Sequence, residues 1–217
     1  DLFSSEKIII REITGKYPKS IISTYSDEIY LFNMSNISIN KKLNKSIDLK
    51  YITVVLNSSL MSYYFINNTA KAVRQMFPKI ILQDLRQFPF KEISLKEQEP
   101  FIQKADLMLE LNKKLQELKQ NFINELNLEK VPTKLQKFEE LDFDDFVKEY
   151  AKAKKLKFAD KLEERNFKND WQRLFENDKK EVLEIQNQIN ITDKEIDQMV
   201  YKLYDLTPDE IKIIEGN

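Results

Sequence analysis

Short apolar runs broken by Gly, Pro, Asn and Ser fill the first ninety residues of the chain. These runs are rich in β-branched and aromatic side chains and cover residues 8–13, 21–25, 29–32 and 37–39. Gly15, Pro18 and Asp27 separate the first three of them. Runs of this length between turn-forming residues are typical of neighbouring strands, so the pattern predicts a small, mostly antiparallel sheet.

The spacing of apolar residues becomes helical between residues 49 and 66. Positions at intervals of three and four are occupied by Ile52, Val55, Leu56, Ser59, Leu60, Tyr63 and Tyr64. This spacing predicts one buried helix of about four turns. Pro78 and Pro89 then bracket residues 79–88, where the apolar positions favour a strand and a turn that close the subdomain.

The pattern is helical from residue 94 onward. Residues 94–97 (SLKE) have the form of a capping box, which predicts that a long helix begins there. Its apolar stripe consists of Leu107, Leu111, Leu115, Leu118, Phe122 and Leu126. We expect this stripe to pack against another helix of the same chain, with dimerisation as the alternative.

Further helices are indicated beyond Pro132, which interrupts the long one. We predict them around residues 143–154 and 170–191, and residues 192–195 (TDKE) and 207–210 (TPDE) look like two more capping boxes. The whole pattern predicts an α+β fold in two domains. Residues 1–91 would form a small, mostly antiparallel sheet with a buried helix, and residues 92–217 a largely α-helical region with a long helix or helical hairpin.

Charge divides unevenly along the chain although the net charge is −1. Residues 1–91 contain 13 Lys and Arg against 7 Asp and Glu, whereas residues 92–217 contain 22 against 29. A basic part joined to an acidic part is expected when only the first faces a polyanion, although two ordinary solvated surfaces would give the same counts.

Composition excludes most catalytic chemistry. Without Cys or His, the chain has no disulfide, no thiolate metal site, no cysteine nucleophile and no histidine base. Two glycines cannot form a glycine-rich phosphate loop. No signal sequence is recognisable, and no apolar run approaches the roughly 18–20 residues of a membrane span. We expect a cytoplasmic protein and, since Asp1 precedes an apolar strand closely, a fragment of a longer one.

The order of several motifs resembles a known specificity domain. Residues 7–13 (KIIIREI), 30–33 (YLFN) and 51–58 (YITVVLNS) are followed by residues 77–80 (FPKI) and 84–90 (DLRQFPF). This series resembles the TaqI-like carboxy-terminal target-recognition domain of adenine-specific DNA methyltransferases and of fused Eco57I-type restriction-modification enzymes. Residues 195–211 (EIDQMVYKLYDLTPDEI) are similar to the helix-turn-helix ending of these enzymes, except that Asp205 stands where many members carry glycine.

The resemblance implies a bacterial protein that recognises a sequence in double-stranded DNA. In the family, this region clamps DNA against a methyltransferase domain of the same chain that flips an adenine and methylates it from S-adenosylmethionine. The motif that holds the flipped base is absent here, as is a convincing nuclease motif, so we expect no catalytic residue and no cofactor in this fragment. S-adenosylmethionine, and with it Mg²⁺ if the parent also cleaves DNA, would belong to the parent's catalytic part.

Candidate DNA-contacting residues follow from the chemistry of recognition. Lys and Arg bind phosphates, Arg favours guanine, and Asn or Gln favours adenine. The candidates are Arg11, Lys16, Lys19, Lys41, Lys42, Lys45, Lys71, Arg74, Gln75 and Lys79. The last four lie in a stretch without acids between residues 51 and 81. Ordinary solvated loops and helix ends remain the alternative for each group.

Other conspicuous residues favour structural roles. Asp142, Asp144 and Asp145 match the acidic start of an amphipathic helix better than a Mg²⁺ site. Trp171 and Tyr201 have the helical spacing of core residues. Two other classes of function stay open: a helical protein-interaction module without DNA binding, and part of the specificity subunit of a multisubunit restriction system.

Overall fold

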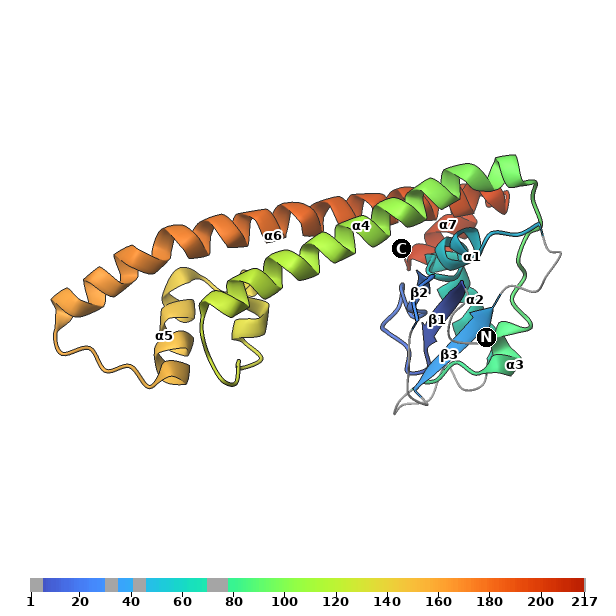
Figure 1. The fold of residues 1–217 in the computed structure, drawn as a ribbon. Helices are drawn as coiled ribbons and strands as arrows, with labels where there is room; N and C mark the ends of the chain where they lie inside the picture. Colours follow the sequence, from blue (N-terminus) through green and yellow to red (C-terminus); the bar gives the residue numbers. More distant parts are fainter. Residues whose placement is uncertain (1–5, 30–34, 41–45, 70–77, 217) are drawn as a thin grey trace. The chain divides into compact units, whose positions relative to one another are not determined.

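A computed structural model describes residues 6–29, 35–40, 46–69 and 78–216 (Figure 1). The chain divides into two compact units. Unit 1 combines residues 1–109 with residues 192–217, and unit 2 consists of residues 110–191. The functional division of the sequence at residue 91 stays a prediction. We describe each unit by itself.

A three-stranded antiparallel sheet forms the start of unit 1. Strand β1 (Lys7–Arg11) lies between β2 (Ser23–Ser26) and β3 (Asn36–Asn40). Since side chains alternate across a strand, Ile8 and Ile10 of β1 face the core. The strands predicted at 8–13, 21–25 and 37–39 are confirmed, with shifted ends. Of the run at 29–32, residues 30–32 lie outside the described residues and Ile29 belongs to no strand.

Two helices, rather than the one predicted, follow the sheet and share its apolar core. They are α1 (Leu49–Leu56) and α2 (Ser59–Asn68). The prediction of a single helix was wrong because Ser58 is extended and caps α2 with its side chain, accepting from the Met61 N–H. Asn57 instead bonds the edge of the sheet, where its side chain pairs with the backbone of Ser23. Apolar spacing that continues across the break hides it from sequence analysis.

The strand predicted at 79–88 is also wrong. Only one isolated bridge forms there, between Ile13 and Lys79, and the chain then enters the short helix α3 (Leu82–Leu85). The carboxylate of Asp84 accepts the Ile81 N–H and so turns the chain at the start of α3. Further strand pairing is lost because this N–H is already used.

Unit 1 is completed by parts of two long helices and by α7 (Pro208–Glu215). The helices are α4 (Leu95–Glu125), capped by Ser94 and Glu97 as predicted, and α6 (Lys161–Leu203). The capping box at 207–210 is confirmed at the start of α7. The box at 192–195 is wrong, because Thr192 is buried inside the continuous helix α6.

Unit 2 has a core built mainly from aromatic rings. Residues 110–125 of α4 and 161–191 of α6 accompany a 3₁₀ helix, η1 (Leu135–Glu140), and α5 (Phe143–Lys154). Phe146 makes ring contacts with Phe122, Phe143, Tyr150, Trp171 and Phe175. From Leu115 onward the predicted leucine stripe packs into this core. None of the described helices is long and apolar enough to cross a membrane.

Candidate nucleic-acid interface

The sheet of unit 1 has one apolar and one polar face. In the register of the strands, Ile9 lies opposite Thr24 and Ser38, and Arg11 lies opposite Asn36. These positions alternate with the core residues, so they occupy the face opposite the one that packs against α1 and α2 (Figure 1). Thr24, Asn36 and Ser38 place hydroxyl and amide groups on this face, where Thr24 Oγ1 donates to the carbonyl oxygen of Tyr25 and Ser38 Oγ to Asn40 Oδ1. Groups of this kind can pair with base edges, and sequence analysis did not single these residues out. The signal in the sequence that could have identified this polar face is the alternation of these residues with the apolar residues Tyr25, Ile37 and Ile39.

Lys7, the first residue of β1, lies on the same face of the sheet as Ile9 and Arg11, but its charge is not exposed. Its side chain is fully buried, and Nζ donates to the carbonyl oxygen of Glu28 at 2.7 Å. A buried lysine that donates to the backbone contributes to the fold of the chain after β2. It therefore offers no surface for a phosphate.

All four candidate cations in the described part of the chain lie at the carboxyl end of β1 or in the segments next to it. Arg11 is exposed, and its Nε donates to the carbonyl oxygen of Ile13 at 2.7 Å. Lys16 lies exposed in the turn that follows. Lys79 bridges to Ile13 and forms an ion pair with Glu12 at 2.9 Å. The structure thus brings Lys79 to the segment that follows β1, although 67 residues separate it from its partner Glu12.

Lys19 is turned toward the acidic end of α6. Its Nζ lies 2.7 Å from Asp197 Oδ2 and 3.0 Å from Asp193 Oδ1. Burial raises the pKa of the Asp193 carboxyl, and the ion pair with Lys19 opposes that shift. Asp197 also accepts the backbone N–H and the hydroxyl of Ser59 at the start of α2. Lys19 is therefore part of the contact that joins residues 192–217 to the rest of unit 1.

The remaining six candidates, Lys41, Lys42, Lys45, Lys71, Arg74 and Gln75, lie outside the described residues. The segment that contains the last three is bounded by described residues on both sides. Thr69 donates to Phe65 at the end of α2, and Thr14 donates its N–H to Pro78. Contact between any of the ten candidates and DNA stays a prediction.

Charge balances within each unit once the fold is known. Residues 192–217 contain 3 Lys and Arg against 7 Asp and Glu, so unit 1 as a whole has 18 of each sign. Unit 2 has 17 against 18. The basic excess of residues 1–91 is thus offset by the acidic end of the chain, partly through the ion pairs of Lys19 and of Lys91 with Asp205. Any attraction to a polyanion must come from local patches.

The structural roles predicted for the acidic cluster and the aromatic residues are confirmed. Asp142 caps α5 by accepting the Asp145 N–H, while Asp144 and Asp145 pair with Lys168 and Lys148. In the described part of the chain no group of His, Cys, Asp or Glu could hold a metal ion. Trp171 lies in the aromatic core of unit 2, and Tyr201 is buried in unit 1.

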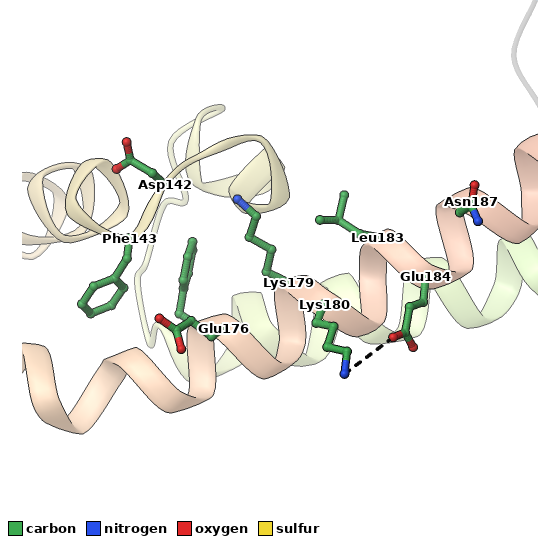
Figure 2. Close-up of a pocket in the computed structure, with 9 residues that line it drawn as sticks. Asp142, Phe143, Glu176, Lys179, Lys180, Leu183, Glu184 and Asn187 are labelled. Carbon is green, nitrogen blue, oxygen red and sulfur yellow. Dashed lines mark ion pairs between the residues drawn. The ribbon is translucent and has the colours of Figure 1, made fainter.

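An open hollow of about 570 Å³ lies between α5 and α6 in unit 2 (Figure 2). Phe143, Phe175 and Leu183 supply its apolar lining. The charged residues around it have other partners: Lys179 donates to the carbonyl oxygen of Leu141, and Lys180 pairs with Glu184 at 3.9 Å. The hollow therefore offers no group arranged for catalysis.

Comparisons with known proteins divide the chain in two. Residues 1–90 match the model of the TaqI-like C-terminal specificity domain. Residues 94–200 match a domain of unknown function, DUF8810. No curated protein and no solved structure matches the chain.

Proposed function

From the premise that residues 1–90 form a TaqI-like C-terminal specificity domain, we propose that the chain recognises a target sequence in duplex DNA for a bacterial restriction-modification enzyme. The family match carries the proposal. The polar face of the sheet supports it, since Thr24, Ser38 and Arg11 supply groups suited to base edges at one surface.

The parent reaction that we propose is adenine methylation, with or without a linked endonuclease. Its methyl group would come from S-adenosylmethionine. The residues of this chain do not fit that cofactor, since Gly15 and Gly216 are its only glycines and neither lies in a glycine-rich loop. Methyl transfer would therefore take place on another domain, and the role proposed for this chain is to hold the DNA in register in the cytoplasm.

Two kinds of contact have separate roles in this proposal. Lysines and arginines that bind phosphates supply affinity and position the duplex, whereas side chains at the base edges supply sequence discrimination. Since unit 1 has balanced charge, we expect the phosphate contacts to come from the acid-free stretch between residues 51 and 81 and from the lysines of residues 41–45. Arg11 and Lys16 would add to these contacts.

The test is fluorescence anisotropy of the chain with random-sequence duplex DNA over a series of salt concentrations. We expect the double variant Lys71→Ala/Arg74→Ala to bind more weakly and to flatten the salt slope by about two units, about one for each phosphate contact. The matched control is Lys113→Ala/Lys114→Ala, which removes the same charge from exposed positions of unit 2. Absence of binding by the wild-type chain at low salt would favour the protein-interaction module instead.

A further inference from the structure

The connection between α5 and α6 in unit 2 carries a concentration of positive charge (Figure 1). Residues 152–161 contain five lysines and one acid. The lysines are Lys152, Lys154, Lys155, Lys157 and Lys161, which we call the α5–α6 lysine cluster. All five are exposed. The rest of unit 2 has an excess of acids, so the cluster is a local feature and not part of a basic domain.

The acids nearest to the cluster in sequence have other partners, whereas Asp170 lines a hollow together with Lys154 and Lys157. Asp160, the acid within the segment, accepts the N–H groups of Leu162 and Glu163 at the start of α6. Glu163 accepts the Ala159 N–H, and Glu164 pairs with Lys168. Among the described residues, none of the five cluster lysines forms an ion pair; Lys154 donates to the carbonyl oxygen of Asn127. Six other lysines of unit 2 do form ion pairs.

Helix stability accounts for only part of the cluster. Cations in the last turn of a helix interact favourably with its dipole, which explains Lys152, Lys154 and Lys155 at the end of α5. Lys157 lies between the helices, where no such benefit exists. Lys161 is the first residue of α6, where the positive end of the helix dipole disfavours a cation. Helix stability therefore does not account for these two positions.

The connection holds its lysines on a folded backbone. Lys155 closes α5 in the left-handed conformation, and Leu156 donates its N–H back to Ala151. Phe158 packs against Phe167 of α6 with ring centroids 5.3 Å apart. Asp160 then caps the next helix. A charged surface held in this way loses little conformational entropy when it binds a rigid polyanion.

We infer that the α5–α6 lysine cluster is a second DNA contact, which binds the phosphate backbone of the duplex without reading its sequence. Duplex DNA is the polyanion that the specificity domain of the same chain selects, so this inference rests on the proposed function. Lysine suits the role because it acts as a flexible point charge, whereas bidentate recognition of a base favours arginine. Unit 2 would thus add affinity, and unit 1 would keep the sequence preference.

The test uses the full chain and random-sequence duplex DNA in the same salt series. The variant Lys152→Gln/Lys157→Gln/Lys161→Gln removes three cluster charges and leaves Lys154 and its backbone contact in place. The control Lys113→Gln/Lys114→Gln/Lys130→Gln removes three exposed lysines of unit 2 that form no ion pair with a described residue. We expect the cluster variant to flatten the salt slope by about two to three units and the control by less than about one.

A second measurement locates the contact directly. Because the chain has no cysteine, a photo-crosslinker attached at Ala159→Cys labels one site only, and Gln116→Cys on α4 is the control position. We expect crosslinks to DNA from position 159 and none from position 116.

The outcomes separate the two proposals. If wild-type chain binds DNA but the cluster variant matches its control and position 159 gives no crosslink, the cluster proposal is overturned and the proposed function stands. An acidic protein surface would then be the better partner for the cluster. If wild-type chain does not bind DNA, both proposals fail.

Discussion

Each of the two units of this chain is stabilised from within by a different kind of interaction. Unit 1 combines segments far apart in sequence. Residues 192–217 join it through apolar residues such as Ile196 and Val200 and through a polar junction, in which the carboxylate of Asp197 binds Ser59 and Lys19. Unit 2 is continuous in sequence, and its centre is a group of stacked and tilted rings around Phe146. Removing a buried ring leaves a cavity that the core refills only partly, and removing a buried carboxylate leaves its hydrogen-bond donors without a partner. Unit 1 should therefore be sensitive to single polar changes and unit 2 to loss of ring volume.

The largest effect should come from breaking the aromatic core of unit 2. Phe146→Ala removes a fully buried ring that contacts five others, and we expect it to lower the free energy of unfolding by about 4 kcal/mol. Trp171 is the only tryptophan, and its ring centroid lies 5.8 Å from that of Phe146. Its fluorescence during urea denaturation therefore reports the unfolding of unit 2. A loss below about 1 kcal/mol would show that the core refills the space and would contradict the comparison.

The next effect should come from the polar junction of unit 1. Asp197→Ala leaves the Ser59 N–H and the ammonium of Lys19 without this partner, and we expect a loss of about 2–3 kcal/mol. Hydrogen exchange should rise in α2 and at the end of α6, while the Trp171 signal of unit 2 stays unchanged. Asp193→Ala is the matched control, since Asp193 has the pair with Lys19 but no bond to Ser59. Equal losses in the two variants would argue against the role of Ser59.

Substitutions of Asp205, in the turn after α6, should have the smallest effect on the stability of unit 1. Asp205 has a φ of 56°, in the left-handed region that favours glycine. We expect Asp205→Gly to raise the stability of unit 1 by a few tenths of a kcal/mol and Asp205→Ala to lower it by about 1 kcal/mol. Thermal unfolding followed by circular dichroism measures both. The ion pair between Asp205 and Lys91 is largely exposed, so its loss should change little.

Local patterns in the sequence predicted the features that are locally determined. The capping boxes at Ser94 and Thr207 depend on neighbouring residues only. The glycine-like position at Asp205 was recognised only through the resemblance to the specificity-domain family. Residues 192–195 have the same Ser/Thr-x-x-Glu pattern, yet α6 continues through them. The reason is that Thr192 is buried and Asp193 binds Lys19, which is 174 residues away. The break at Asn57 was missed for the same reason, since its side chain bonds Ser23, 34 residues away.

The candidate interface was only partly accessible to sequence analysis. Counting charges identified the basic first part, but it could not show that Lys19 and Lys79 bind acids of the same unit. It also missed the cluster between α5 and α6, because residues 92–217 are acidic as a whole and hide a local excess of lysine. Pairing between distant residues decides which charges remain available to a ligand, and that information comes from the fold.

The central claim is that this chain prefers a particular sequence of duplex DNA, and selection from a pool of randomised duplexes tests it most directly. After several rounds of binding and amplification, we predict enrichment of one sequence that the chain binds at least about 1,000-fold more tightly than random DNA at physiological salt. Duplexes that remain random after selection, with equal affinity for every sequence, would contradict the claim.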